Sequence, residues 1–565
     1  MIVRRPVPDS HAALLAHGLP PVLARIFAAR GIVDAAELDH SLDALPDFAQ
    51  LANIEAAAAR LAHAIERRER ILVVADYDAD GATACAVAIR GLRTMGADAD
   101  FLVPNRFAFG YGLTPEIVMV AAQRAPRLLV TVDNGIASVD GVRAAATAGI
   151  DVLVTDHHLP GAELPHPAVI VNPNQPGCGF PSKHIAGVGV MFYVLCALRA
   201  RLRESGAFAQ RAEPNLASLL DLVALGTVAD VVHLDHVNRI LVGQGLARMR
   251  GGRAHPGVAA LFAVAGRDIT RATASDLGFV AGPRLNAAGR LADMSLGIRC
   301  LVSDDDAEAQ AIARELDRLN RERRDIEARM QQEALADIEA ALATPVAAGA
   351  CTVCAYRSEW HQGVIGIVAS RLKDRYHRPA VVFAQAGEHE LKGSGRSIAG
   401  FHLRDALDLV AKRAPGTIMR FGGHAFAAGL SIARDALPRF METFEAVARE
   451  ALSEAALART HDSDGELAPG ELTLDLGASL RERVWGQGFP APAFDGVFDV
   501  VEQRGVGDGH AKLTLARGRE RFPAIAFRTQ AALPARIHAL FRPEVNHFQG
   551  LVNLELVIEF WSPAP

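Results

Sequence analysis

Short apolar runs alternate with helical patterns between residues 71 and about 235. The runs are rich in Val, Ile, Leu and Ala, and most of the segments between them repeat apolar residues at helical spacing. Short apolar strands that alternate with helices are typical of a parallel sheet covered on both faces. We therefore expect an α/β domain here. The predicted strands are residues 71–75, 99–103, 128–132, 152–155 and 169–171, and the predicted helices include 83–95, 115–124 and 139–148.

The rest of the chain divides into segments with different patterns. A long stretch without proline predicts one helix, with Ser303 and Asp306 as its capping box, and this helix would join two domains. Five or so short strands, the first at 472–476, suggest a small OB-like β-barrel at the end of the chain. The expected segments are an N-terminal helical arm (1–52), the parallel-sheet domain (53–235), a helical extension with an unusual loop at 282–290 (236–303), the connecting helix (304–345), a smaller α/β domain (346–459), a polar linker (460–470) and the barrel domain (471–565).

Acidic residues stand at the ends of four apolar runs. Three aspartates at alternate positions follow the first run, one follows another, and an Asp-His-His triplet and a single aspartate close the remaining two. Ligands of open α/β sheets bind at the carboxyl ends of the strands, so we expect these side chains to meet at one sheet edge. The residues are Asp76, Asp78, Asp80, Asp133, Asp156, His157, His158 and Asp230.

This collection of side chains predicts a metal centre. Closely packed carboxylates repel one another, and a cation bound among them offsets this repulsion. Carboxylate oxygens with one or two imidazoles suit Mn²⁺ or Mg²⁺, and the lack of cysteine argues against structural zinc. Six carboxylates exceed the needs of one ion, so we expect two ions about 3.5–4 Å apart. Such a pair activates water and clamps a phosphoryl oxygen, which indicates hydrolysis of a phosphate ester or anhydride.

Simpler interpretations exist for each residue taken singly. An aspartate after a strand is often a helix N-cap, and Asp133-Asn-Gly could be a plain turn. A haloacid-dehalogenase-type phosphatase would use the first aspartate of Asp78-Ala-Asp80 as its nucleophile. That scheme accounts for neither Asp76 nor the later Asp-His-His triplet, so the joint pattern favours the metal centre.

Composition narrows the class of protein further. The chain has 565 residues, of which half are hydrophobic and 22% charged, and its formal net charge is −6. A negative chain has no overall attraction for nucleic acid, so any nucleic-acid surface must be local. The six cysteines, Cys351-x-x-Cys354 included, are expected to be reduced core residues. Without a signal-peptide pattern or a membrane-spanning apolar run, we expect a soluble cytoplasmic protein.

Several motifs resemble one known family. Asp76-Tyr-Asp78-Ala-Asp80-Gly81, the Asp133 turn, Asp156-His157-His158 and Asp230 are similar to the four motifs of the DHH phosphoesterase superfamily, and Gly422-Gly423-His424 resembles its DHHA1 domain. Nearly the whole chain resembles the RecJ exonuclease family within that superfamily. The longer motifs that carry this resemblance are Pro104-Asn-Arg106-Phe-Ala-Phe-Gly110-Tyr-Gly-Leu113, Gly282-Pro-Arg284-Leu-Asn286-Ala-Ala-Gly289-Arg290 and Trp360-His-Gln-Gly363-Val-Ile-Gly366.

The resemblance implies a 5′→3′ exonuclease that degrades single-stranded DNA to mononucleotides in recombination and repair, with Mn²⁺ or Mg²⁺. It implies metal ligation by Asp78, Asp80, Asp133, His157 and Asp230. Asp76 would be a further ligand or lie just behind the ligands, Asp156 would orient the histidines, and His158 would contact the scissile phosphate. The residues expected to bind the strand are Arg106, Arg284, Asn286, Arg290, Ser370, Arg371, Arg396, Gly422, Gly423 and His424.

Within this set, Arg106 and Arg284 are expected to form a fork for a terminal 5′-phosphate. The barrel is expected to track the strand through Arg504, His510 and Lys512. A single-strand-binding protein and a helicase are the expected partners of a monomer. Two alternatives remain open: a DHH phosphodiesterase acting on short oligonucleotides or cyclic dinucleotides, and a non-catalytic scaffold, which the complete set of acids disfavours.

Overall fold

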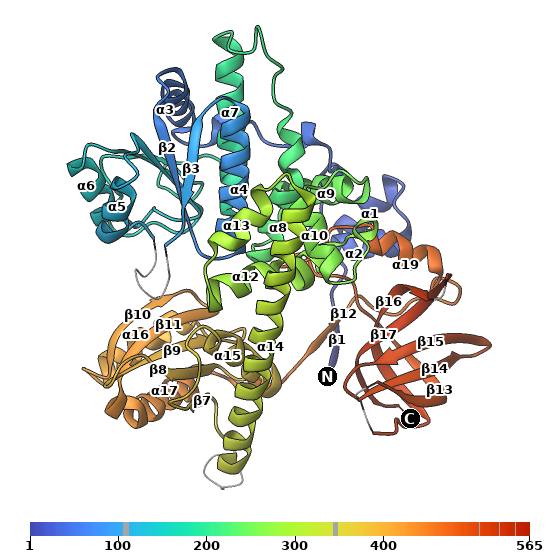
Figure 1. The fold of residues 1–565 in the computed structure, drawn as a ribbon. Coiled ribbons are helices and arrows are strands. Elements are labelled where there is room, and N and C mark those ends of the chain that lie inside the picture. Colours follow the sequence, from blue (N-terminus) through green and yellow to red (C-terminus); the bar gives the residue numbers. More distant parts are fainter. Residues whose placement is uncertain (105–111, 343–348, 508, 530, 549, 565) are drawn as a thin grey trace. The chain divides into compact units, whose positions relative to one another are not determined.

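The computed structural model describes residues 1–104, 112–342, 349–507, 509–529, 531–548 and 550–564. The chain forms two compact units, which are described separately (Figure 1). The smaller unit contains Met1 and Arg318–Thr460. The larger unit contains Ile2–Asp317 and His461–Pro565, so its two parts are far apart in the sequence.

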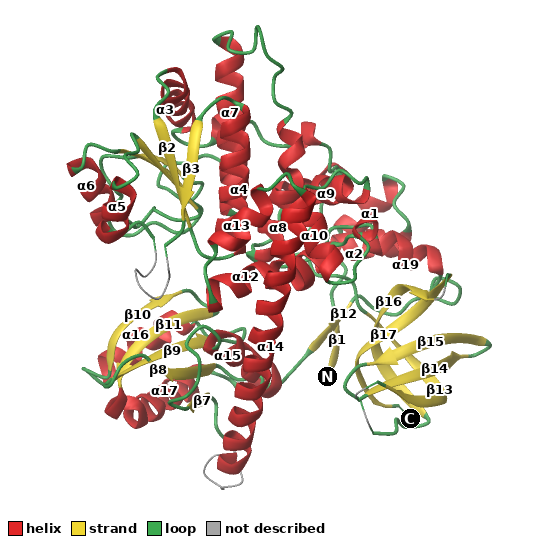
Figure 2. Ribbon diagram, viewed as in Figure 1, coloured by secondary structure: helices red, strands yellow, loops and turns green. Residues whose placement is uncertain are grey.

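A five-stranded parallel sheet forms the centre of the larger unit. Its strand order is β3-β2-β4-β5-β6, and each neighbouring pair is parallel. Helices α4 and α7 lie on one side of the sheet, and α5 and α6 lie on the other (Figure 2). The strands are β2 (Arg70–Ala75), β3 (Asp98–Leu102), β4 (Leu128–Val132), β5 (Asp151–Thr155) and β6 (Val169–Val171), and the helices are α3 (Ile54–Glu66), α4 (Ala79–Thr94), α5 (Pro115–Ala122), α6 (Val139–Thr147) and α7 (Gly187–Glu204). The predicted parallel-sheet domain is therefore confirmed.

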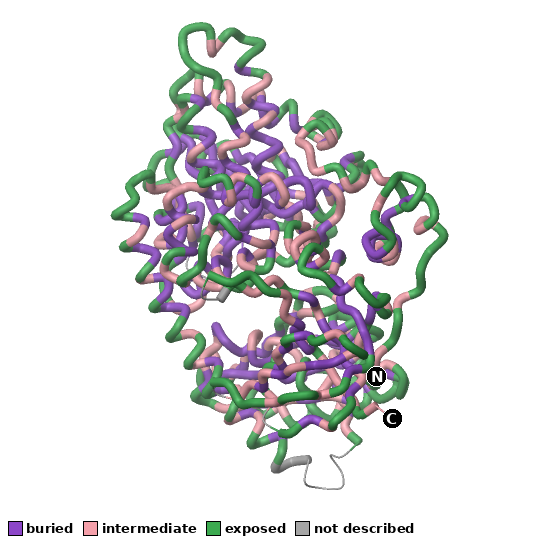
Figure 3. The backbone as a smooth tube through the Cα atoms, turned by 90° about the vertical axis from the view of Figure 1, so that its right-hand side faces the viewer, coloured by how far each residue is buried: buried purple, intermediate pink, exposed green. Residues whose placement is uncertain are grey.

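Apolar side chains hold the sheet against helices α5 and α6. Leu72, Val74 and Leu129 are fully buried and pack with Ile117 of α5 and Val142 of α6. Each such side chain contributes roughly 1.5–3 kcal/mol when it is removed from water. Figure 3 shows how buried segments (purple) run through the interior while the connecting loops (green) are exposed. The sheet therefore gives the loops after its strands a rigid base.

Several helices come after the sheet in the sequence, and two of them, α8 and α12, differ from the predicted secondary structure. Residues 282–290 were expected to form a loop but belong to helix α12, because a proline is tolerated in the first turn of a helix. The apolar run that ends at Asp230 is helix α8, which is buried on nearly every side, so its sequence resembles that of a buried strand. The elements are η4 (Leu216–Leu219), α8 (Leu220–Ala229), α9 (His236–Arg250), α10 (Pro256–Val264), η5 (Ile269–Arg271), α11 (Ala274–Asp276), a π-helical turn η6 (Leu277–Ala281), α12 (Gly282–Leu291) and α13 (Ser295–Val302).

The long connecting helix α14 (Asp306–Leu342) confirms the expected joining element. Its 37 residues span roughly 55 Å at 1.5 Å per residue. The predicted capping box is wrong, because Asp305 rather than Ser303 accepts the hydrogen bonds of the first turn, from the amides of Ala307 (2.7 Å) and Glu308 (3.0 Å). No helix in the described ranges is both long and apolar enough to cross a membrane.

The smaller unit contains a mixed five-stranded sheet of order β10-β11-β9-β8-β7. Phe383 of the sheet meets Phe440 edge to face, with ring centroids 5.3 Å apart, in a buried apolar core. This unit confirms the expected second α/β domain. Its elements are β7 (Val353–Tyr356), α15 (Ile365–Tyr376), β8 (Ala380–Gln385), β9 (Glu390–Arg396), α16 (Leu403–Arg413), β10 (Ile418–Gly423), β11 (Ala427–Ala433), η7 (Arg434–Ala436), α17 (Leu437–Ala451) and α18 (Glu454–Leu457).

A closed barrel of order β13-β14-β15-β17-β16 confirms the predicted C-terminal fold. The strand expected at 472–476 is wrong: Leu474 and Leu476 belong to helix α19. Thr473 caps the start of this helix, since its Oγ1 accepts a hydrogen bond from the Leu476 amide at 3.2 Å. Strand β16 was missed, since Arg542, Pro543 and Glu544 interrupt its apolar pattern. The elements are α19 (Leu474–Arg481), β13 (Phe494–Val506), β14 (His510–Arg517), β15 (Glu520–Ala526), β16 (Arg536–Phe548) and β17 (Leu551–Pro563).

The N-terminus is attached to the barrel region by a parallel strand pair. Ile2–Arg4 (β1) pairs with His461–Ser463 (β12), so part of the predicted linker is a strand. Beside this pair the buried carboxylate of Asp495 accepts hydrogen bonds from Arg4 (2.9 and 2.7 Å) and Ser463 (2.5 Å) and contacts His538 Nε2 (2.9 Å). The remaining N-terminal elements are α1 (Ser10–Ala16), α2 (Pro21–Ala28), η1 (Ala35–Leu38), η2 (Leu42–Ala44) and η3 (Phe48–Gln50).

We predict that Asp495→Ala lowers the free energy of unfolding of the larger unit by about 3 kcal/mol at pH 7, because it removes the partner of Arg4 and His538. Burial alone would raise the pKa of Asp495, but the hydrogen bonds from Arg4 and Ser463 lower it to about 2. The difference between wild type and variant should therefore shrink as pH falls from about 4 towards 2. Denaturant unfolding at neutral and acid pH measures this. Asp499→Ala, on the same strand but in an exposed pair with Arg536 at 3.7 Å, should cost less than about 1 kcal/mol.

Candidate metal centre

The Asp76–Asp80 loop connects strand β2 to helix α4. Asp78 is the N-cap of α4, and its Oδ1 accepts a hydrogen bond from the Gly81 amide at 3.0 Å. The helix therefore begins at Ala79, four residues earlier than predicted, and Asp80 lies in its first turn. Gly81 has to lack a side chain, since a Cβ there would lie 2.6 Å from the Asp76 carbonyl oxygen. The three aspartates are thus fixed by the strand-to-helix turn itself.

Asp80 is fully buried and is held by a second helix. Its two carboxylate oxygens accept hydrogen bonds from the amides of Gly187 (2.7 Å) and Val188 (2.9 Å) at the N-terminus of α7. The positive end of a helix dipole favours a carboxylate at this position. Helix α7 therefore supports a charge that burial alone would disfavour.

Asp133 follows strand β4 in a left-handed backbone conformation, with φ of 61°. Its amide donates to the Thr155 carbonyl at 3.0 Å, which ties the turn to strand β5. Gly187 approaches it closely: a Cβ on Gly187 would lie 2.7 Å from both Cβ and Oδ1 of Asp133. The same glycine thus contacts two of the predicted ligands.

Asp156 lies behind the two histidines that follow it. Its Oδ1 accepts from the amides of His157 (2.7 Å) and His158 (3.1 Å) and lies 2.8 Å from His158 Nδ1. Its Oδ2 accepts from the Ile136 amide at 2.9 Å. Asp156 is buried and holds the triplet in place, and its direct contact with a ring is to His158.

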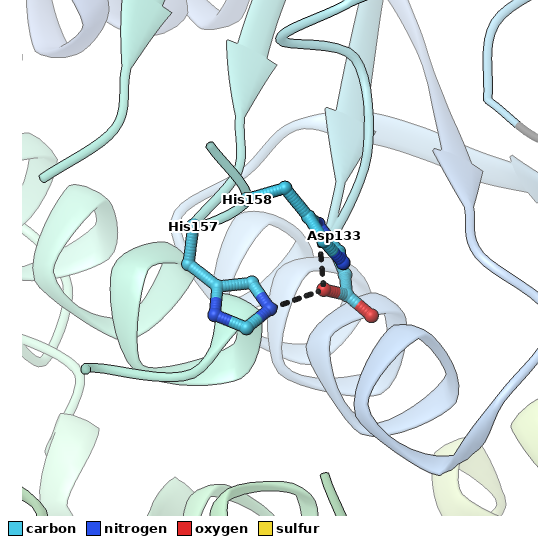
Figure 4. Close-up of side chains that lie close together, drawn as sticks. All are labelled: Asp133, His157 and His158. Carbon is cyan, nitrogen blue, oxygen red and sulfur yellow. Dashed lines mark ion pairs between the residues drawn. The ribbon is translucent and has the colours of Figure 1, made fainter. Parts of the chain in front are cut away.

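His157 points its Nε2 into the cluster of carboxylates. This atom lies 3.1 Å from Asp133 Oδ1, 3.5 Å from Asp230 Oδ2 and 3.9 Å from Asp80 Oδ2. Figure 4 shows the rings of His157 and His158 next to the same oxygen of the Asp133 carboxylate, Oδ1. His157 Nε2 is buried and makes no hydrogen bond with the described residues. A ring nitrogen that faces three carboxylates in this way could hold a metal ion together with them.

Asp230 reaches the cluster from a helix rather than from a strand. It caps the C-terminus of α8, which crosses close to α4. A Cβ on Gly226, one turn earlier, would lie 2.1 Å from Thr83 Oγ1 and 2.9 Å from Asp80 Oδ1. The expectation that all the acids follow strands at one sheet edge is therefore wrong for Asp230, which a packed helix adds to that edge.

The electrostatics of the cluster reflect burial and mutual repulsion. Burial and the neighbouring aspartates raise the pKa of Asp80 and Asp133 well above their usual range. Burial and Asp78 raise the pKa of Asp230 to about 7. Burial lowers the pKa of His157 to about 4, so its ring is neutral at pH 7. Burial also opposes the charged form of His158, but the hydrogen bond with Asp156 raises its pKa to about 9.

Three sets of side chains place their ligand atoms within 4.8 Å of one another. They are Asp80, His157 and Asp230; Asp76, Asp78 and Asp133; and Asp133, His157 and His158. Oxygen and neutral imidazole ligands without thiolates match Mn²⁺ or Mg²⁺. A bound cation would also remove the repulsion that raises the carboxylate pKa values. The donor set therefore fits divalent metal.

Helix α12 supports the Asp76–Asp80 loop, a role that sequence reasoning missed. Asn286 Oδ1 accepts a hydrogen bond from the Ala79 amide at 2.9 Å. A Cβ on Gly289 would lie 2.0 Å from the Tyr77 carbonyl oxygen, so the helix packs directly against the loop backbone. The signal available in the sequence was a glycine inside a helical segment, which often marks a close backbone approach.

The other residues predicted to bind the strand fall into both units. Arg284 pairs with Asp317 Oδ1 (Nε 3.0 Å, Nη2 2.8 Å), and Arg290 lies in the last turn of α12. Arg106 lies outside the described residues. In the smaller unit Arg371 pairs with Glu327 at 2.9 Å. The remaining members of that unit are Ser370 on α15, Arg396 on β9, Gly422 and Gly423 on β10 and the exposed His424 after it.

Gly423 and Arg396 have identifiable local roles. Gly423 has φ of 144°, and a Cβ there would lie 2.4 Å from the Ala427 carbonyl oxygen, so the hairpin requires glycine. Arg396 Nη1 donates to Ser394 Oγ (3.2 Å) and the Gly395 carbonyl (2.8 Å). Burial lowers the pKa of Arg396. Among the described residues no carboxylate forms an ion pair with it, which leaves its charge available to an anion.

Family models match three parts of the chain. The DHH family N-terminal domain matches residues 70–227, the DHHA1 domain residues 348–450 and the RecJ OB domain residues 463–559. The parallel sheet with its acid and histidine cluster, the second α/β unit and the barrel agree with these matches. The fold and the site together define a DHH phosphoesterase.

Relatives of known name match almost the full length. The single-stranded-DNA-specific exonucleases RecJ of Dickeya dadantii (strain 3937) and Escherichia coli (strain K12) are each 48% identical, over 99% of this chain and 98% of theirs. The crystal structure of RecJ in complex with Mn²⁺ from Thermus thermophilus matches with a TM-score of 0.82 at 31% identity, over 100% of this chain and 79% of that chain. The chain belongs to the RecJ family of single-stranded-DNA-specific exonucleases.

We predict that Gly187→Ala weakens Mn²⁺ binding by about 10- to 100-fold while the protein stays folded, because the new Cβ displaces Asp133 and the Asp80 contact. Isothermal titration calorimetry with Mn²⁺ and a circular dichroism melt measure the two effects. Gly179→Ala, where a Cβ meets no atom within 4 Å, is the matched control. Equal affinities for the two variants would contradict the proposed geometry.

Proposed function

We infer that the protein is a metal-dependent exonuclease that degrades single-stranded DNA in the 5′→3′ direction to mononucleotides, in DNA recombination and repair. The observation that carries this proposal is the cluster in which His157 Nε2 faces Asp80, Asp133 and Asp230 within 4 Å. The full-length match to RecJ exonucleases supports the substrate class. The match to a RecJ structure with Mn²⁺ supports the choice of metal.

Two Mn²⁺ or Mg²⁺ ions fit the ligand sets of the cluster. One set is Asp80, His157 and Asp230, and the other is Asp78 and Asp133 with Asp76 beside them. Ions of this kind lower the pKa of a bound water and neutralise charge on phosphoryl oxygens. The chain itself supplies the supports for the ligands: the α7 amides hold Asp80, and helix α12 holds the loop that carries Asp76 and Asp78.

His158 acts on the substrate side of the cluster, and the buried Asp156 supports it from behind. Asp156 holds His158 Nδ1 at 2.8 Å and so fixes the orientation of the ring. We assign His158 to contact with the scissile phosphate, where a ring held in this way can donate a hydrogen bond to the oxygen that gains charge. Asp156 then acts as a positioning residue for His158.

The arginines outside the cluster set the polarity of the proposed reaction. Arg284 and Arg106 are assigned to a terminal 5′-phosphate, which would fix where the strand ends relative to the ligands. In the smaller unit Arg396, Arg371 and Ser370 are candidates for further phosphates. A single-strand-binding protein and a helicase remain the proposed partners, and a monomer the proposed state.

We predict that Asp80→Ala reduces nucleotide release from a 5′-phosphorylated single strand with Mn²⁺ by on the order of 10³-fold or more, since it removes a ligand that two helices hold. A quenched-flow assay with labelled strands measures this. Asp98→Ala removes an exposed carboxylate at the start of β3 and should retain full activity.

The substrate panel for this assay contains a long single strand, a duplex and linear and cyclic dinucleotides. Degradation of the single strand alone supports the exonuclease. Cleavage confined to dinucleotides would instead identify a DHH phosphodiesterase for short substrates. Strand binding without any cleavage would identify a scaffold.

We also predict that Arg284→Ala reduces the preference for 5′-phosphorylated over 5′-hydroxyl ends by about tenfold, with Mn²⁺ binding unchanged. Steady-state kcat/KM values on the two strands measure the preference. Asp317→Asn weakens the ion pair of Arg284 but keeps the guanidinium, so it should keep the preference. A preference that falls equally in both variants would show that the Arg284–Asp317 pair is structural only.

A further inference from the structure

Asp230 differs from other predicted ligands in how its side chain is held. Asp78 accepts a hydrogen bond from the Gly81 amide, and Asp80 accepts two from the amides of α7. Among the residues that the structure describes, no donor forms a hydrogen bond with the Asp230 carboxylate. Its contact with His157 Nε2 at 3.5 Å joins it only to another predicted ligand. The position of Asp230 therefore depends on the backbone that carries it.

That backbone is strained at the next residue. Val231 has φ of 65°, in the left-handed region that a β-branched residue rarely adopts. The Val231 side chain is 63% exposed, so its packing does not account for this conformation. Such strain persists only where the surrounding structure fixes the chain. Helix α8 fixes one side, since the Val231 amide donates to the Val228 carbonyl at 3.2 Å, and the residues after Val231 have to supply the other restraint.

The segment of residues 232–235 is joined to a tight turn that lies far along the chain. The Leu234 amide donates to the Gln487 carbonyl at 2.8 Å. Gln487 belongs to a turn of residues 486–489, which two hydrogen bonds between its end residues close, at 2.9 and 3.1 Å. A Cβ on Gly488 of this turn would lie 1.9 Å from His233 Cδ2. The turn is therefore in direct contact with the segment that follows Val231.

Arg239 of α9 joins the same segment to the same turn through its side chain, which is almost completely buried. Arg239 Nη1 donates to the Leu234 carbonyl at 3.0 Å, and its guanidinium lies 4.3 Å from the centre of the Phe489 ring. Phe489 stacks in turn on Trp485, with ring centroids 5.4 Å apart. The turn cannot move away from the segment without breaking the cation–π contact between Arg239 and Phe489.

The turn belongs to the barrel part of the chain. It lies between α19 and β13, within residues 463–559, which match the RecJ OB domain. Asp230 instead follows α8, one of the helices next to the parallel sheet. The barrel part therefore contributes backbone and side-chain contacts to the support of a predicted metal ligand.

We propose that the turn 486–489 and Arg239 position Asp230 for metal binding. They hold residues 232–235 in the path that keeps Val231 in its left-handed conformation, and this conformation keeps the adjoining carboxylate in the cluster. Loss of either contact lets Val231 relax to a negative φ and moves Asp230 away from the other ligands. The proposal rests on the proposed function, because it concerns the affinity of that site for its metal.

Isothermal titration calorimetry of the metal-free protein with Mn²⁺ tests the turn. Asp230 belongs to only one of the three ligand sets. Gly488→Ala should therefore weaken one Mn²⁺ site by about tenfold and leave a second site unchanged, since residues that support a ligand usually affect metal affinity to this extent. Gly518→Ala is the matched control, because Gly518 of the barrel has a left-handed φ of 61° and a Cβ there meets no atom within 4 Å. Equal affinities for the two variants would overturn the role of the turn.

A double-mutant cycle tests the link through Val231. Arg239→Met removes the hydrogen bond to the Leu234 carbonyl and should weaken the same Mn²⁺ site by about tenfold. Glycine adopts the left-handed region readily, so in a Val231→Gly background the same change should cost only about twofold. Arg239→Lys keeps a donor and should lose less than Arg239→Met. An equal loss in both backgrounds would show that strain at Val231 is not the link, and circular dichroism melts establish that each variant is folded.

Nuclease assays separate this role from strand binding. In Gly488→Ala, the Mn²⁺ concentration for half-maximal kcat on a 5′-phosphorylated single strand should rise by about tenfold, with KM for the strand unchanged. Excess Mn²⁺ should restore kcat. A raised KM that excess Mn²⁺ does not correct would show that the turn acts on DNA, and the proposal would be overturned. If the wild type binds no Mn²⁺ or degrades no single strand, the proposed function itself fails, and that result is visible before any variant is compared.

Discussion

Mutual repulsion among buried carboxylates is the constraint around which the larger unit is built. Asp80 and Asp133 are almost completely buried. His157 Nε2 lies within 4 Å of the carboxylates of Asp80, Asp133 and Asp230. Their pKa values are raised by burial and by one another. Such a group is stable only where a cation compensates for it or where dipoles and hydrogen bonds hold it. The site therefore depends on metal for its charge and on the surrounding helices for its geometry.

Close backbone packing supplies that geometry. Gly187 lets the N-terminus of α7 approach Asp80 and Asp133, and Gly289 lets α12 approach the Asp76–Asp80 loop. Gly226 lets α8 cross beside Asp80. A larger residue at any of these positions would push the helices apart and move the predicted ligand side chains away from one another. A protein interior leaves little empty space to absorb such a change. The glycines thus matter to the chemistry although they carry no chemical group.

The predictions that failed have several physical causes. The run before Asp230 is a helix rather than a strand, because buried helices and buried strands show similar apolar content. Residues 282–290 form a helix rather than a loop, because their proline lies in the first turn, where a helix tolerates it. The pairing of Ile2–Arg4 with His461–Ser463 joins residues more than 450 positions apart, which no local pattern indicates. Local capping also decided boundaries: Asp78 starts α4 early, and Asp305 replaces Ser303 at α14.

The sequence by itself determined the parallel sheet, the second α/β unit, the barrel and the chemistry of the acid cluster, because strand periodicity and the types of the charged residues are local properties. Only the tertiary structure decided which atoms face one another. It placed His157 Nε2 among three carboxylates, brought Asp156 into contact with His158 Nδ1 and paired Arg284 with Asp317. Apart from the contact between Asp156 and His158, which lie in one loop, these contacts join residues that are distant along the chain, and their distances follow from how the helices and the sheet pack together. Residue type therefore specified the reaction class, and packing specified the roles.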